Sequence, residues 1–346
     1  MKNIISIFIL GFLGMSIIAH SQGCAEPSSD EGVTVFGFLQ PQMDLNFEEE
    51  TNATVRFNRM RMGVMGNIPY DFSYYALLET SPFVNQDGQI YLIDAFVSYS
   101  RFSFAKVSIG QFKKPFGREL LTPCSGLYTI NRSEVVNNLT GPTNRDMGIT
   151  VLGAMLDNKI KYQVAMMNGA GASKINDNRF FDYYGRVELQ PVSFLSVGGS
   201  FVYGLADPSV PDSDSNDEKW RYGTDIELLY KGIRLQSEYV FGEDVGSYTT
   251  GGGCDGDAQV HTGSIKRDGF LVMAMYNITD NIQPIIKYEE FHADRADDNL
   301  LHQTTTFGAN FYFNDWTRVQ INYLYKAEDP TEIKNDALLM QVQVKF

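Results

Sequence analysis

Basic side chains gather in one long stretch of the chain that shows no regular hydrophobic periodicity. Residues 113–146 carry Lys113, Lys114, Arg118, Arg132 and Arg145. Guanidinium and ammonium groups donate strong hydrogen bonds to phosphate and carboxylate oxygens, so the chemistry indicated is anion binding. A connection this long inside a compact domain is uncommon unless it serves a function. We interpret it as a loop that folds back into a barrel and brings these groups to the narrowest point of the bore.

Four further basic candidates lie on the polar faces of strand-like segments, opposite apolar rows. They are Arg59, Arg61, Lys106 and Arg186. Acidic residues share the same polar faces: Glu79, Asp94, Glu188, Asp225, Glu227, Glu238 and Glu289. Two interpretations stay open: a basic ladder that conducts anions, or paired charges that hold the shape of the wall.

Strand periodicity dominates the rest of the chain. Apolar and polar residues alternate through sixteen segments between residues 33 and 346. In one of these, Tyr91, Ile93, Ala95 and Val97 share the apolar face, opposite Leu92, Asp94 and Phe96. The connections alternate strictly in length, with seven short and eight long. This pattern predicts an all-β fold, a 16-stranded antiparallel transmembrane β-barrel with short periplasmic turns, long outer loops and an inward-folded third loop.

A large soluble β-sandwich or propeller is the competing fold. One alternate face is almost wholly apolar, whereas the other carries charge in most strands. Sixteen strands enclose too much space for side chains to fill, so the charged face belongs inside, in water. Aromatic residues also crowd the strand ends, as the interfacial girdles of membrane barrels require.

The N-terminus reads as an export signal. Residues 1–21 carry a lysine, an apolar run and small residues before Gln22, which predicts a cleaved signal peptide. A short membrane helix or lipidation of Cys24 are the alternatives. Residues 22–32 are expected to form a periplasmic segment. After these residues no segment is apolar enough for a transmembrane helix, and the mean hydropathy is −0.20, which excludes a helical membrane protein. The net charge of −14 and the lack of a basic stripe disfavour nucleic-acid binding.

The remaining motifs carry little chemistry. Asp212 to Glu218 lacks the glycine and glutamate of a calcium loop. Cys124 and Cys254 both fall on outer loops, where a disulfide bridge is one possibility. His292 has no matching nucleophile signature. We therefore expect no enzyme activity, no cofactor and no metal site.

These segments together resemble the phosphate-selective porin O/P family of bacterial outer-membrane porins. The resemblance rests on Val107 to Glu119, which includes Gly-Gln-Phe-Lys-Lys-Pro-Phe-Gly, and continues at Asn131-Arg132-Ser133, Arg145 to Gly148 and Gln283 to Tyr288. It implies an outer-membrane porin, a passive diffusion channel for small hydrophilic solutes that include anions such as phosphate. It also implies a homotrimer with a basic constriction. Inward acids nearly match the inward bases here, unlike members with a strongly basic lumen. The alternative is a plugged barrel with a structural or surface-binding role.

Overall fold

The computed structural model describes residues 32–48, 50–140, 144–176, 178–205, 218–250, 259–296, 300–327 and 333–346. The predicted signal peptide, Cys24, Cys254 and the acidic stretch 212–217 lie outside these ranges. The strands are β1 (Thr34–Phe47), β2 (Asn52–Ile68), β3 (Phe72–Glu79), β4 (Tyr91–Phe102), β5 (Ala105–Lys113), β6 (Arg145–Met155), β7 (Ile160–Met167), β8 (Asp182–Val192), β9 (Leu195–Leu205), β10 (Glu218–Tyr230), β11 (Ile233–Thr250), β12 (Gln259–Tyr276), β13 (Ile282–His292), β14 (Leu301–Tyr312), β15 (Thr317–Ala327) and β16 (Asp336–Lys345). The helices are α1 (Ser81–Asn85), α2 (Arg118–Leu121), the 3₁₀ turn η1 (Cys124–Gly126) and α3 (Glu134–Leu139).

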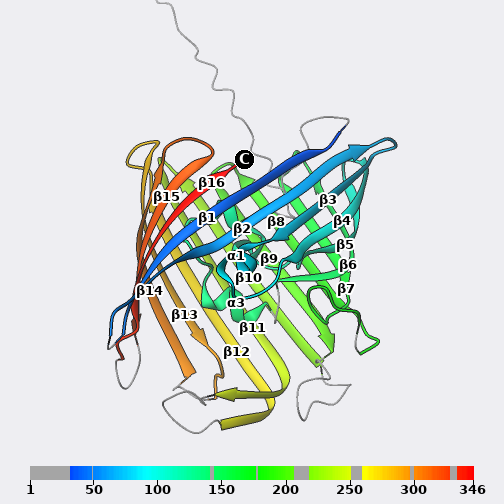
Figure 1. Cartoon of the computed structure of the whole chain (residues 1–346). Helices are drawn as coiled ribbons and strands as arrows, with labels where there is room; N and C mark the ends of the chain where they lie inside the picture. Colours follow the sequence, from blue (N-terminus) through cyan, green and yellow to red (C-terminus); the bar gives the residue numbers. More distant parts are fainter. Residues whose placement is uncertain are drawn as a thin grey trace, which may run out of the picture.

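The strands form one closed barrel in which each pairs with its neighbours in the chain (Figure 1). The first and last strands close it, with Phe38 opposite Lys345 and Leu39 opposite Val344. Closure leaves no unpaired edge, which a strand surrounded by hydrocarbon requires because lipid cannot hydrogen-bond to its backbone. The predicted sixteen-stranded antiparallel barrel is confirmed.

Short turns gather at one end of the barrel and long connections at the other, at the top and bottom of Figure 1. The turn between β10 and β11 has only Lys231 and Gly232 at its centre, with φ of 49° and 82°. Two successive residues with positive φ are typical of the tight hairpins whose twist matches the flanking strands.

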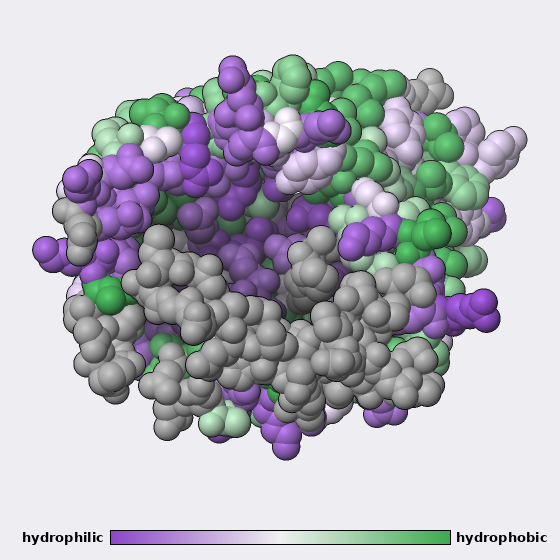
Figure 2. Space-filling view, turned by 60° about the horizontal axis from the view of Figure 1, so that its bottom comes forward, coloured by the Kyte–Doolittle hydropathy of each residue, from purple (hydrophilic) through white to green (hydrophobic). Residues whose placement is uncertain are grey.

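Each strand presents one face outward and one into the barrel. In β9, Val197 and Phe201 are exposed on the outside, whereas Ser200 and Val202 are buried on the inside. Polar side chains line much of the interior, among them the buried amides of Gln40, Gln42, Gln320, Gln341 and Gln343. Figure 2, which looks toward the end with the long connections, shows a hollow lined by hydrophilic residues. The charged and polar faces therefore point inward, as predicted.

Strand β4 departs from simple alternation. The register between β3 and β4 shifts at Leu77/Leu78, so Tyr91 lies opposite Glu79, whose side chain is buried inside the barrel. Ile93 is also buried rather than exposed. The expectation that Tyr91 and Ile93 share the apolar outward face was wrong, because a β-bulge reverses the side-chain direction beyond it.

The connection between β5 and β6 folds into the barrel, as predicted for the third loop, and α3 lies within the barrel outline in Figure 1. We call residues 114–144 the inner loop. Leu120, Val135, Val136 and Leu139 of this loop are fully buried and belong to one apolar cluster with wall residues, including Val240 and Leu271. The inner loop is thus a packed element with its own core, held against the wall by burial of apolar side chains.

Candidate functional site

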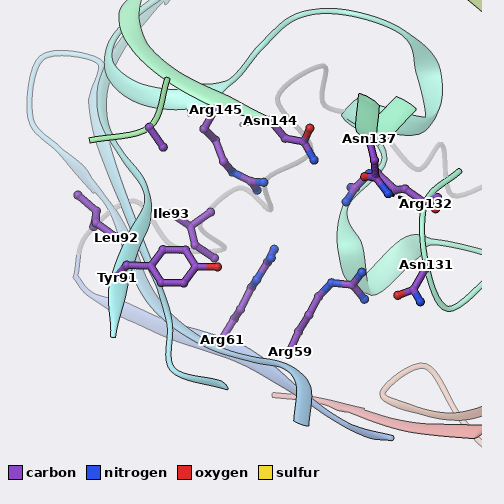
Figure 3. A pocket seen from close by; sticks show the side chains of 11 residues that line it. Arg59, Arg61, Tyr91, Leu92, Ile93, Asn131, Arg132, Asn137, Asn144 and Arg145 are labelled. Atoms are coloured by element: carbon purple, nitrogen blue, oxygen red, sulfur yellow. Dashed lines mark hydrogen bonds between the residues drawn. The ribbon is translucent and has the colours of Figure 1, made fainter. Parts of the chain in front are cut away.

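Four arginines converge on a cavity of about 340 Å³ between the inner loop and the wall formed by β2 and β4 (Figure 3). Arg59 and Arg61 come from β2, Arg132 from the inner loop and Arg145 from the first position of β6. Figure 3 shows Arg61 and Arg145 pointing toward one another across this space. We call it the arginine cavity. Its other lining residues are Tyr91, Leu92, Ile93, Asn131, Asn137, Asn144 and Ala172.

Two of these arginines have carboxylate partners. Arg61 Nε lies 2.7 Å from Glu79 Oε2, and Arg145 Nε lies 3.1 Å from Asp94 Oδ1. Both carboxylates are buried inside the barrel. These pairs hold their guanidinium groups in fixed orientations and cancel their charge locally.

The other two arginines have no ion-pair partner among the described residues. Arg59 Nη1 donates to Gln40 Oε1 (3.0 Å) and to the carbonyl of Ile130 (3.2 Å). Arg132 donates to the carbonyls of Glu119 (3.1 Å), Leu120 (3.3 Å) and Thr122 (2.5 Å). Neutral carbonyls satisfy hydrogen bonds without cancelling charge. Four guanidinium groups against two carboxylates leave the arginine cavity with an excess of two positive charges.

Tyr91 and three asparagines complete the lining and were missed as candidates from the sequence. Tyr91 projects its ring into the cavity, and the amides of Asn137 and Asn144 come from the inner loop (Figure 3). Amides bind anions and neutral polar solutes alike. The signal for Tyr91 was hidden by the β-bulge, and the asparagines lie in a segment without periodicity.

The two lysines at the start of the inner loop do not line this cavity. Lys113 Nζ donates to the carbonyls of Leu121 (3.1 Å) and Thr122 (2.9 Å), and Lys114 Nζ donates to that of Thr140 (3.2 Å). Both side chains are buried. They connect the start of the loop to its middle and end. Burial lowers the pKa of Lys114 to about 8.

Arg118 and Arg186 lie in a second group of charges, on the wall formed by β8 and β10. Arg118 Nε is 2.8 Å from Asp225 Oδ1, and Arg186 Nη1 is 2.5 Å from Asp225 Oδ2. Glu227 and Glu188 add further ion pairs with Arg118 at 3.2 and 3.6 Å. We call these five residues the paired-charge cluster. Each of the three carboxylates contacts at least one of the two arginines, which corresponds to the interpretation of paired charges that hold the wall.

Lys106 lies apart from both groups, at the second position of β5 near the end with short turns. Its side chain is half-buried. The structure therefore brings together Arg59, Arg61, Arg132 and Arg145 in the cavity lining. Lys113 lies beside them without lining the cavity, opposite Arg145 in the sheet and bonded to the same Thr122 carbonyl as Arg132. Lys106, Lys114, Arg118 and Arg186 are not part of the lining.

None of the helices in the described ranges is long and apolar enough to cross a bilayer. No three histidine, cysteine or acidic side chains among them are grouped so as to hold a metal ion.

A family model described as phosphate-selective porin O and P matches residues 39–346. The chain belongs to this porin family. The match spans the barrel from within β1 to the last residue, including the inner loop and all four arginines of the cavity. No curated protein matches the chain.

Solved structures with the same fold are outer-membrane porins of low sequence identity. OmpF of Salmonella typhi is 12% identical at a TM-score of 0.66, covering 92% of this chain and 98% of that one. An anion-selective porin from Comamonas acidovorans is 11% identical at a TM-score of 0.63, and the match covers 91% of this chain and 99% of that one. OmpT of Vibrio cholerae in its trimer form is 13% identical at a TM-score of 0.62, and the match covers 91% of this chain and 99% of that one. Family and fold together make this chain an outer-membrane channel protein.

Proposed function

We propose that this porin is a passive diffusion channel that favours small anions, and that the arginine cavity is its selective constriction. The observation that carries the proposal is the excess of two guanidinium groups, those of Arg59 and Arg132, over carboxylates in the cavity lining. A net charge at the narrowest point of an aqueous path has the largest effect on which ions pass, because low-dielectric walls focus the field there.

Solutes bearing phosphate or carboxylate groups suit this lining best. Guanidinium groups present several N–H donors in a plane and bind such oxygens bidentately. The amides of Asn131, Asn137 and Asn144 add neutral donors beside them. The family match and the anion-selective porin of the same fold support this assignment.

Export and assembly belong to the same proposal. Residues 1–21 act as a cleaved signal peptide, residues 22–32 form a periplasmic segment, and the barrel sits among outer-membrane lipids with its exposed apolar face outward. We assign a homotrimer, supported by the trimer form of one porin of the same fold. Mass spectrometry of the mature N-terminus and the mass of the detergent-extracted protein test these two points. The channel has no enzymatic role in this proposal.

The deciding experiment measures the reversal potential of the purified protein in a planar bilayer under a KCl gradient. We expect an anion-selective current, partly blocked by added phosphate. Replacing Arg59→Gln should lower the chloride-to-potassium permeability ratio by about twofold or more. Lys231→Gln, in an exposed turn outside the barrel, is the matched control and should change nothing. A cation-selective or unselective wild-type current would refute the anion preference.

A plugged barrel is the second candidate, and the density of bonds between loop and wall favours it. The inner loop bonds to β2 through Arg59, to β15 through Asn322 and to β16 through Gln343, besides the paired-charge cluster. A plugged barrel would give no conductance from protein shown to be folded. Conductance of any selectivity rules this candidate out.

A further inference from the structure

Cys124 lies behind the arginine cavity, within contact of two of its arginines. It is buried in η1 and carries a free thiol. Arg61 Nη1 donates to its Sγ at 3.1 Å from the wall side, and Arg132 Nη1 donates to the same sulfur at 3.3 Å from the loop side. A neutral thiol is a weak acceptor, so two charged donors aimed at one sulfur match a thiolate far better.

The charge balance of the cavity, counted without the cysteine, also favours a thiolate at this position. Arg132 and Arg59 have no carboxylate ion-pair partner in the described residues, and apart from the four arginines the cavity is lined by amides, a phenol and apolar groups. The Cys124 sulfur is therefore the acceptor beside Arg132 that can itself become an anion. A negative charge on this sulfur would offset one of the two excess positive charges of the cavity.

The basic groups packed around the sulfur favour its anionic form. Arg59 and Arg61 face it from β2, Lys113 from β5 and Arg132 from the inner loop. Burial by itself raises the pKa of the Cys124 thiol, but these four cations outweigh burial and bring the pKa well below its usual range. The nearby acids Glu79 and Asp94 are engaged by Arg61 and Arg145.

We propose that Cys124 is a selectivity-determining residue of this channel: its thiolate is a built-in counter-anion that competes with permeating anions for Arg61 and Arg132. The proposal rests on the anion preference proposed above. With the thiolate, the net charge of the cavity is one positive charge. Without the thiolate, the net charge is two positive charges. A solute anion in the cavity then meets two guanidinium groups whose attraction is shared with the sulfur.

The test compares Cys124→Ser, Cys124→Ala and Cys124→Asp with wild type in the same bilayer measurement. Serine and alanine remove the titratable anion, so both should raise the chloride-to-potassium permeability ratio by about twofold. Both should also lower the phosphate concentration needed for half block. Aspartate retains a negative charge and should keep the ratio near that of wild type. Serine and alanine variants that fold and keep the wild-type ratio would overturn the proposal.

A spectroscopic measurement keeps the proposal falsifiable if a variant fails to fold. The ultraviolet difference spectrum of folded wild type between neutral and acidic pH isolates this sulfur, because cysteines of ordinary pKa are already protonated at about pH 7. We expect a thiolate band at neutral pH that disappears on acidification. A neutral thiol at pH 7 in folded wild-type protein would overturn the proposal.

The two proposals fail in different ways. If Arg59→Gln lowers anion selectivity while the Cys124 variants do not change it, the cysteine proposal fails and the anion channel stands. If wild type and Arg59→Gln are equally unselective, the anion preference itself fails.

Discussion

Arg118 on the inner loop lies 2.8 Å from Asp225 on β10, and this ion pair fastens the loop to a part of the wall far from the strand it leaves. The backbone N–H groups of Arg118 and Glu119 strengthen the junction by donating to Glu238 Oε2 at 3.0 and 2.9 Å. The position of the loop, and with it the arginine cavity, depends on charges outside the cavity.

Removing the Arg118 side chain should loosen the loop without changing the charge of the arginine cavity. We expect Arg118→Ala to cost the docked loop about 1–3 kcal/mol, because Asp225 and Glu227 keep other partners but the loop loses its own. Single-channel recordings should show more frequent transitions and greater open-channel noise. Lys161→Ala, which breaks an ion pair with Glu188 between two wall strands, is the control. Equal noise in both variants would contradict this role for Arg118.

The apolar core of the inner loop should contribute as much to its docking in the barrel as its ion pairs do. Leu139 is fully buried in α3 against the barrel wall. Leu139→Ala should destabilise the docked loop by about 2–5 kcal/mol, because it leaves a cavity that the surrounding barrel cannot close. Limited proteolysis of protein in detergent should then cut within residues 114–144 at lower protease concentration. Asn138→Ala changes the exposed neighbour in the same helix and should leave the cleavage rate at the wild-type level.

The lowered pKa of Lys114 predicts that the free energy of unfolding depends on pH. Its pKa is lowered by burial from 10.5 to about 8. Between these pH values the unfolded chain holds a proton that the folded protein has released, so the free energy of unfolding rises with pH across this window. The increase attributable to Lys114 should approach about 3 kcal/mol.

The measurement compares chemical unfolding of wild type and Lys114→Met in lipid vesicles near pH 8 and near pH 10.5. Methionine cannot titrate, so the difference between the two proteins isolates Lys114 from other groups. Asn138→Met, at an exposed position of α3 that carries no titratable group, should retain the wild-type pH dependence. A parallel response of wild type and Lys114→Met would exclude this contribution.

Tyr91 should limit the width of the arginine cavity. Its ring projects into the space between β2 and the inner loop, and it carries no charge there at neutral pH (Figure 3). Tyr91→Ala should raise single-channel conductance on the order of tens of per cent, since pore width sets the current, with little change in the permeability ratio. Tyr70→Ala, in an exposed turn, is the control. An altered permeability ratio with unaltered conductance would argue against a steric role.

The barrel fold could be predicted from the amino-acid sequence alone. Alternation with a period of two is a local property of each strand, so the lumen-facing positions of Arg59, Arg61 and Arg186 followed from counting residues. The alternating lengths of the connections set the number of strands and identified the long segment between β5 and β6 as the loop that enters the barrel. Each of these inferences needed only neighbours in the chain.

Which charged side chains act together could not be predicted, because it depends on how the inner loop packs against the wall. Arg118 and Arg132 lie in the same loop, yet one meets carboxylates of β10 and the other meets carbonyls and a cysteine sulfur. Their partners are set by the path of a loop without periodicity, which packing against the wall selects. Tyr91 reached the cavity through a β-bulge that alternation cannot reveal. Charge balance at a site depends on contacts between residues far apart in sequence, and these form only when the barrel closes.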